Sequence, residues 1–218
     1  MSSYPYKHIM WDWNGTLLND AWMAVNVINE TLSKRAMPTI SLEHYQEIFG
    51  FPVIDYYRRL GFDFVAESFE KVGTEFIEGY ERCRYNVDLH PGVRTTLEAL
   101  NQLGVTHSIL SAYKQQTLDE LVMHHDLTKF FIKIYGLDNH YAHSKVDNGI
   151  AWMKELGLEP EKVLFIGDTP HDYEVAQAIN VDCVLITGGH QTRKALVATG
   201  ARVVDRVGDI LGIFSNEG

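Results

Sequence analysis

The chain has 218 residues, a hydrophobic content of 45% and a formal net charge of −10. This length suits one large domain or a core domain with an inserted subdomain, and the acidic balance argues against a surface for nucleic acid or anionic membranes. The two cysteines form no metal-binding pattern, no stretch approaches the ~20 apolar residues of a membrane span and no signal peptide is evident, so we expect a cytoplasmic protein.

The first predicted element is a strand over residues 6–11, an apolar run that ends at Asp12. Apolar residues then recur at helical spacing in four segments as far as about residue 85, and the last segment is expected to begin at Val65. No strand signal appears between these points. Residues 19–85 are therefore predicted to form an all-helical cap, and residues 1–18 and 86–218 the core domain.

Helices and strands alternate in the second half of the chain. The predicted strands cover residues 105–110, 131–135, 162–166 and 183–186, and a short helix is expected near 207–214. This alternation predicts an α/β fold with a doubly wound, Rossmann-like parallel sheet. Because the helical segment follows the first strand, we expect it to lie over the carboxyl edge of the sheet.

Carboxylates stand at the ends of two predicted strands. Asp12 follows the first strand, and Asp168 and Asp172 follow the strand over residues 162–166. Ligands of open α/β sheets bind at the carboxyl ends of strands, so these three side chains are expected in one crevice. Three carboxylates in one place repel one another, and the occupant that best relieves this repulsion is a hard cation, here Mg²⁺.

Four sequence motifs, taken in their order along the chain, resemble those of the haloacid dehalogenase-like hydrolases, in the phosphatase branch with a helical cap. The pattern is closest to phosphoglycolate phosphatase-like enzymes. The motifs are Asp12-Trp13-Asn14-Gly15-Thr16, Ser111 after a strand, Lys145 opening a helix, and Gly167-Asp168-Thr169-Pro170-His171-Asp172. The resemblance implies Mg²⁺-dependent hydrolysis of small-molecule phosphate monoesters through an aspartyl-phosphate. The substrate would be a small phosphorylated metabolite.

The resemblance also assigns roles to residues. Asp12 would be the nucleophile, and Lys145 would pair with it and with the phosphate. The metal would be held by Asp12, the backbone carbonyl of Asn14, Asp168 and Asp172. The phosphate would be grasped by Ser111, the amide of Ala112 and the tight turn at Gly15 and Thr16.

Position 14 departs from the family pattern, in which an aspartate protonates the leaving group. Asn14 cannot exchange a proton, and a positioned acid/base contributes roughly 10²- to 10⁴-fold. One alternative is therefore a regulatory protein that binds phosphate and metal with negligible turnover. Phosphonatase and dehalogenase types also lack this aspartate. The first needs a cap lysine near residues 49–53, where this chain has none, and the second works without metal and does not keep the pair seen here at Gly167-Asp168. The presence of Asp168 and Asp172 therefore favours metal-dependent phosphoryl transfer.

Several residues have a plain structural interpretation. Asn19 or Asp20 is expected to cap the first cap helix, and Gly188-Gly189 to form a simple turn. For His171 and His190 two positions stay open, one near the site and one at the surface, and the surface is the more common for a histidine. The cap aromatics are expected mostly in the core of the cap, with some of them lining the roof over the substrate. The sequence leaves the choice between a monomer and a homodimer open.

Overall fold

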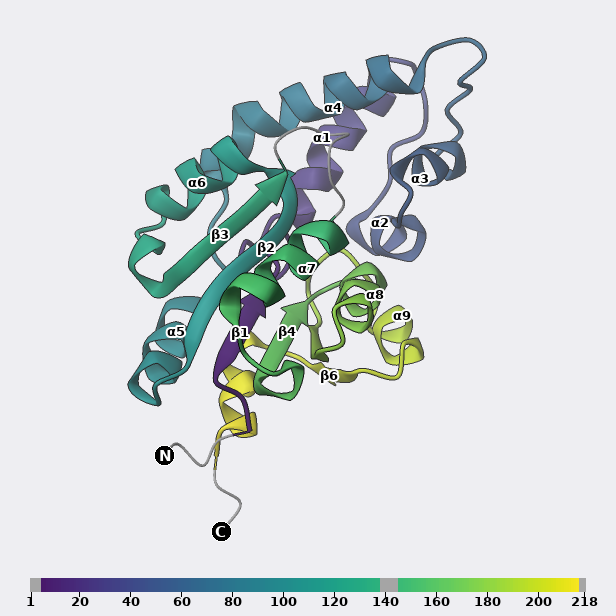
Figure 1. Cartoon of the computed structure of the whole chain (residues 1–218). Coiled ribbons are helices and arrows are strands. Elements are labelled where there is room, and N and C mark those ends of the chain that lie inside the picture. Colours follow the sequence, from purple (N-terminus) through teal and green to yellow (C-terminus); the bar gives the residue numbers. More distant parts are fainter. Residues whose placement is uncertain (1–4, 138–144, 216–218) are drawn as a thin grey trace.

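A computed structural model describes residues 5–137 and 145–215 of the chain. Its centre is a six-stranded sheet in the order β3-β2-β1-β4-β5-β6, in which every neighbouring pair is parallel (Figure 1). The strands are β1 (His8–Trp11), β2 (Thr106–Lys114), β3 (Phe131–Leu137), β4 (Val163–Gly167), β5 (Asp182–Ile186) and β6 (Arg202–Val204). The predicted α/β parallel-sheet fold is confirmed.

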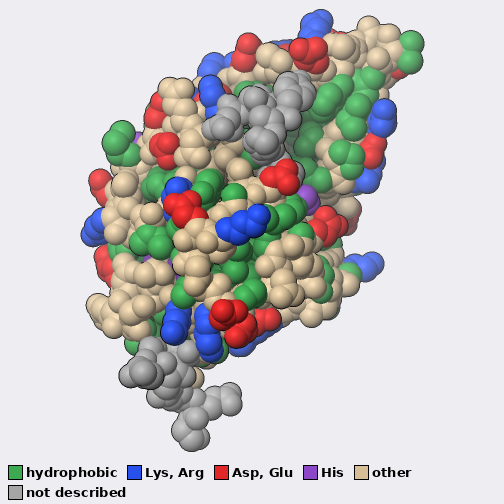
Figure 2. Space-filling model, viewed as in Figure 1, with side chains coloured by type: hydrophobic (Ala, Val, Ile, Leu, Met, Phe, Trp, Pro, Cys, Tyr) green, Lys and Arg blue, Asp and Glu red, His purple; other side chains and the backbone are tan. Residues whose placement is uncertain are grey.

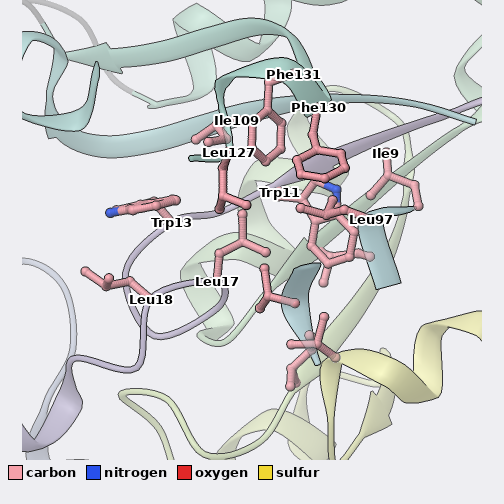
Figure 3. Close-up of a cluster of buried hydrophobic side chains, with 14 of the residues drawn as sticks. Ile9, Trp11, Trp13, Leu17, Leu18, Leu97, Ile109, Leu127, Phe130 and Phe131 are labelled. Carbon is pink, nitrogen blue, oxygen red and sulfur yellow. The ribbon is translucent and has the colours of Figure 1, made fainter. Parts of the chain in front are cut away.

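Alternating side chains of the central strands enter two separate cores. Ile9 and Trp11 of β1 pack on one face of the sheet and Met10 on the other, as the period-two geometry of a strand requires. The first face is covered by α5 (Val93–Gln102), α6 (Gln115–His124) and the 3₁₀ helix η4 (Val207–Ile213), and the second by α7 (Lys145–Leu156) and α8 (Pro170–Ala178). Figure 3 shows Trp11 in the first core, beside Leu97 and Phe130. The sheet is therefore doubly wound.

The cap is a run of helices between β1 and α5. Its helices are α1 (Ala21–Ser33), α2 (Leu42–Ile48), α3 (Val53–Arg59) and α4 (Phe69–Cys83). They share a core of their own that is rich in aromatic rings, including Tyr45, Tyr56 and Tyr57. Figure 1 shows α1 and α4 beyond the arrowheads of the central strands, so the cap stands over the carboxyl edge of the sheet as expected.

Four elements differ from the prediction. Val65 is 98% exposed and precedes α4, because Ser68 accepts a hydrogen bond from the Lys71 amide and starts the helix there. Strand β2 runs on to Lys114, which pairs with Leu137 of β3, so Ser111 lies inside the strand. The remaining two elements, α9 (Arg193–Ala198) and β6, were not predicted, because segments this short carry no readable period.

The short segments between these elements are η1 (Arg84–Asn86), η2 (Thr128–Phe130) and η3 (Pro160–Lys162), all 3₁₀ helices. Within the described parts of the chain, we find no helix with the length and apolar character needed to cross a membrane.

Two buried histidines make the fold sensitive to acid. His8 is hydrogen bonded to Thr106 and Ser108, and burial lowers its pKa to about 3; burial likewise lowers the pKa of His107 to about 4. The unfolded chain takes up protons at both histidines below about pH 6.5, whereas the folded protein does not. Each histidine is therefore expected to remove about 2 kcal/mol of the free energy of unfolding between pH 7 and pH 5.

Denaturant unfolding at pH 7 and pH 5 measures this effect. The variant His8→Gln should reduce this change by about 2 kcal/mol, whereas His44→Gln, at an exposed position of α2, should leave it as in the wild type. An unaltered pH dependence in His8→Gln would contradict the prediction.

Candidate active site

Three buried carboxylates meet at the carboxyl ends of β1 and β4. The two strands are neighbours, and the Asp12 amide donates a 2.8 Å hydrogen bond to the Ile166 carbonyl. Asp168 follows β4, and Asp172 lies in the first turn of α8. One carboxylate oxygen from each of Asp12, Asp168 and Asp172 lies within 4.8 Å of the other two. The structure thus brings together side chains that are more than 150 positions apart in sequence.

The start of α8 fixes the position of Asp172. Thr169 is the N-cap and accepts from the Asp172 amide, while the Asp172 Oδ2 accepts from the Thr169 amide at 3.0 Å, which together form a capping box. Pro170 occupies the first turn, where its missing N–H costs no hydrogen bond. The Asp168 amide also donates to Asp172 Oδ2. This side chain is therefore held rigidly by the backbone at the strand–helix junction.

Lys145 joins two of the carboxylates. Its Nζ lies 2.5 Å from Asp12 Oδ1 and 2.6 Å from Asp172 Oδ1, and its side chain is only 4% exposed. Burial raises the pKa of Asp12 to about 7, with Asp172 and Asp168 adding to this effect and Lys145 opposing it. Burial alone would lower the pKa of Lys145, but Asp12 and Asp172 raise it above its usual value. The ammonium group therefore stays charged.

The charge and chemistry of this cluster fit Mg²⁺. A single ammonium group offsets only one of three carboxylates, so two negative charges are left uncompensated in a buried place when all three are ionised. Burial raises the pKa of Asp168 to about 6, which shows the same strain on its ionised form. Carboxylate oxygens are the ligands that Mg²⁺ prefers, so Asp12 and Asp168 have the right chemistry for this ion.

Two glycines let the backbone close around Asp168. A Cβ atom added to Gly15 would lie 2.3 Å from Asp168 Oδ2, and one added to Gly189 would lie 2.2 Å from it. The Thr16 hydroxyl donates to Asp168 Oδ1 at 2.8 Å and the His190 amide to Oδ2 at 2.7 Å. The segment Gly188-Gly189 is thus more than the simple turn that was predicted, because it encloses an acidic residue of the site.

His190 is buried and lines the cavity at the site, so of its two predicted positions the one near the site is confirmed and the surface position is wrong. It is 7% exposed, its Nε2 lies 3.4 Å from Asp20 Oδ1 and its Nδ1 lies 2.8 Å from the Tyr45 hydroxyl. Burial alone would lower the pKa of His190, but Asp20 raises it to about 9. His171, in contrast, is partly exposed and contacts Glu174.

Asp20 is a member of the site that the sequence did not single out. It stands at the N-cap of α1 but makes no capping hydrogen bond with its side chain. Its carboxylate instead accepts from the Gly15 amide at 2.7 Å and from the Tyr80 hydroxyl at 2.6 Å. The only available signal is its place eight residues after Asp12, in the loop that leads from the sheet into the cap.

Asn14 is fixed by this neighbour. Its Nδ2 donates to Asp20 Oδ2 at 2.9 Å and lies 2.7 Å from the Tyr80 hydroxyl. An amide group held in this way has the shape of the aspartate that the family pattern implies at this position. It offers hydrogen-bond donors but no exchangeable acidic proton at neutral pH.

A cavity of about 770 Å³ between the cap and the core connects most of the predicted residues. The predicted residues that line it are Asp12, Asn14, Ser111, Ala112, Lys145 and Asp172. Gly15, Thr16 and Asp168 contact one another beside it, and a contact of Gly15 or Thr16 with substrate stays a prediction.

With this geometry in place, comparison with known proteins identifies the class. The family model described as haloacid dehalogenase-like hydrolase matches residues 9–186. The chain belongs to this family, so the predicted resemblance is confirmed.

Individual relatives show which members of this family the chain resembles. Phosphoglycolate phosphatase 1 of Pseudomonas aeruginosa is 26% identical over 216 residues, covering 93% of this chain and 78% of the relative. A protein named tyrosine-protein kinase PtkA, from Mycobacterium bovis, is 24% identical and covers 94% of this chain and 72% of the relative. Both lie below the identity at which a shared reaction could be assumed.

Solved structures support the fold. A haloacid dehalogenase-like hydrolase from Streptococcus pneumoniae superposes with a TM-score of 0.84 at 20% identity, covering 97% of this chain and 99% of the other. A structure described as a predicted phosphoglycolate phosphatase from Haemophilus somnus has a TM-score of 0.80 at 21% identity, covering 98% and 100%. These two structures show the fold, while the family model and the sequence relatives support the phosphoglycolate phosphatase-like branch and an enzyme of the phosphatase type.

Proposed function

We propose that this protein is a Mg²⁺-dependent phosphatase that hydrolyses small phosphate monoesters through an aspartyl-phosphate on Asp12. The observation that carries the proposal is the buried cluster of Asp12, Asp168 and Asp172, with Lys145 bridging the first and the last. Several relatives are named phosphoglycolate phosphatase and others tyrosine-protein kinase PtkA, which supports phosphoryl chemistry. At 24–27% identity these names do not fix the substrate of this chain.

The proposed reaction consists of two successive displacements at phosphorus. Asp12 attacks phosphorus with a carboxylate oxygen, the ester P–O bond breaks, and the alkoxide or phenoxide leaves with the bonding pair and takes up a proton from solvent. Water then attacks the same phosphorus, the bond to Asp12 breaks, and inorganic phosphate leaves. Lys145 orients the Asp12 carboxylate and offsets the negative charge of the phosphate, and Ser111 and the Ala112 amide line the position where its oxygens would lie.

Mg²⁺ would be held by Asp12, Asp168 and the backbone carbonyl of Asn14, with Asp172 as the remaining candidate ligand. When bound, the ion supplies charge neutralisation for the transferring phosphoryl group. Asp172 also accepts from Lys145 and from the backbone of the strand–helix junction. It therefore has a second task, which is to hold the ammonium group beside Asp12.

Removal of the metal tests this function directly. Phosphate release from phenyl phosphate is expected in the presence of Mg²⁺ and should fall to the background rate after treatment with EDTA, because Asp12 alone would repel the phosphate dianion. Activity should return when excess Mg²⁺ is added. Full turnover in EDTA, or no turnover with Mg²⁺ on any phosphate ester, would contradict the proposal.

The amide at position 14 should make the enzyme selective for good leaving groups. In Asn14→Asp the new carboxyl group would stand against Asp20, where Asn14 Nδ2 lies 2.9 Å from Oδ2, so it would hold a proton and act as an acid. We expect turnover of an alkyl phosphate to rise about 10-fold or more, within the usual range for such a group, and turnover of phenyl phosphate to change little.

The double variant Asn14→Asp/Asp20→Asn is the matched control. It keeps one acid and one amide in the pair but exchanges their places, so the repulsion between the two side chains disappears. If neither variant raises alkyl phosphate turnover, position 14 does not limit the reaction. If neither variant nor the wild type turns over any ester, a binding protein that retains the site is the better description.

The remaining assignments complete the proposal. Residues 19–85 act as the cap, and residues 1–18 with 86–218 as the catalytic core. The partner is a small phosphorylated metabolite in the cytoplasm, and either a monomer or a homodimer is compatible with the site.

A further inference from the structure

The cavity beneath the cap has two chemically different ends. Its core end carries the carboxylate and ammonium groups of Asp12, Asp172 and Lys145. Its cap end is lined by aromatic side chains, among them Tyr45, Phe49, Phe51, Tyr56, Phe76 and Tyr80. At about 770 Å³ the cavity has room for far more than a phosphate group. A phosphate held beside Asp12 therefore places the rest of its ester among rings.

The rings at the cap end already contact one another in geometries that favour a further ring. Phe49 stacks on Tyr45 with their centroids 4.9 Å apart and meets Tyr56 edge-to-face at 5.3 Å. Phe51 packs against Phe49 at 5.6 Å and against His171 at 4.9 Å. Aromatic pairs at such distances stabilise one another beyond the burial of their area. Figure 2 shows hydrophobic side chains gathered over α3, at the outer side of this region.

The charges that line the cavity disfavour an acidic ester group. Among the described residues, its cationic side chains are Lys114, Lys145 and His190, all from the core, and the cap contributes neither lysine nor arginine. His190 is already paired with Asp20. Lys145 is already bound to Asp12 and Asp172. The acidic Glu70 and Glu81 line the same space. A carboxylate on the ester group would therefore meet aromatic rings and like charge at the cap end.

One polar atom at the cap end lacks a partner. Tyr56 lines the cavity, is 2% exposed, and its hydroxyl makes no hydrogen bond with any described residue. A buried hydroxyl without a partner is energetically unfavourable.

We infer that the ester group of the substrate is an uncharged aromatic ring, held by the cap rings, and not a small carboxylate such as that of phosphoglycolate. The inference rests on the proposed phosphatase function and narrows its substrate class to aryl and arylalkyl phosphates. A phenolic leaving group also needs little protonation, which matches the amide at Asn14.

Binding of phosphonates measures recognition of the organic group separately from its reactivity as a leaving group. The P–C bond of a phosphonate is not cleaved by attack on phosphorus in this way. Calorimetry with the whole protein and Mg²⁺ would compare benzylphosphonate, methylphosphonate and phosphonoacetate. We expect benzylphosphonate to bind at least about 10-fold more tightly than methylphosphonate, as burial of one ring allows. Phosphonoacetate should bind no more tightly than methylphosphonate.

Variants locate the effect at the cap. Phe51 is 47% exposed, so Phe51→Ala should fold, and it should lose at least about 3-fold of the preference for benzylphosphonate, as expected for the loss of one aromatic contact. Val65→Ala changes an exposed apolar residue of the cap that does not line the cavity, and it should keep the preference. Inorganic phosphate should bind equally to all three proteins.

Tighter binding of phosphonoacetate than of benzylphosphonate would overturn the inference, as would a benzyl preference that Phe51→Ala leaves unchanged. Because the readout is binding, it remains informative if turnover is absent. A phosphatase that prefers acidic analogues would refute the aromatic substrate alone, whereas an inactive protein that binds benzylphosphonate would refute the proposed reaction alone.

Discussion

Replacing Asp12 by asparagine is expected to lower phenyl phosphate turnover roughly 10³- to 10⁶-fold, the range seen when a nucleophile is removed. An amide oxygen is a poor nucleophile, whereas the shape of the side chain and its contact with Lys145 are preserved. The substitution also removes one of three buried carboxylates that repel one another. The free energy of unfolding measured without metal should therefore stay the same or rise.

Steady-state turnover and denaturant unfolding measure the two halves of this prediction. Asp119→Asn, at an exposed position of α6, is the matched control and should leave both quantities unchanged. Turnover by Asp12→Asn near the wild-type rate would exclude Asp12 as the nucleophile. Loss of activity together with global unfolding would show only that the residue is structural.

Removal of Lys145 should have the largest effect on stability. Its ammonium group lies 2.5 Å from Asp12 and 2.6 Å from Asp172 in a buried place, so Lys145→Ala leaves carboxylates without a partner. Breaking a buried pair in this way typically costs about 3–5 kcal/mol. Turnover should fall as well, because neither Asp12 nor the phosphate retains its cation. Excess Mg²⁺ should restore part of the lost stability, since it offsets the same charges.

The control for this variant is Lys133→Ala. Lys133 forms an exposed ion pair with Glu155 on the core, and such pairs contribute at most about 1 kcal/mol. Thermal unfolding of both variants, with and without Mg²⁺, separates loss of a buried pair from loss of a positive charge. Equal and small effects of the two substitutions would contradict the role given to Lys145.

The sheet and the cap could be predicted because the apolar residues of each follow a recognisable pattern in the sequence. Buried runs such as residues 162–166 read as strands, and the segment between the first and second strands carries only helical spacing. Asp12 and Asp168 could be placed in one crevice because both follow such strands. By the same reasoning, β6 was missed, since three residues at an edge give no pattern.

The ion pair between His190 and Asp20 could not be predicted from the sequence, for a different reason. His190 and Asp20 are 170 positions apart, and each alone looks like an ordinary surface or capping residue. Their pairing depends on the turn at Gly188-Gly189, which folds back over Asp168. No local sequence pattern predicts this turn. The cap aromatics were visible in the sequence, but which of them line a cavity depends on how the cap sits on the sheet.

The central claim is that Asp12 attacks phosphorus, and trapping the covalent intermediate tests it most directly. Protein mixed with phenyl phosphate and Mg²⁺, then quenched and treated with borohydride, would be digested and analysed by mass spectrometry. Borohydride reduces an aspartyl-phosphate to homoserine, so homoserine is predicted at position 12, only in samples that contain both substrate and Mg²⁺. Phosphate release at the same rate with an unmodified Asp12, or reduction at another aspartate, would contradict the account.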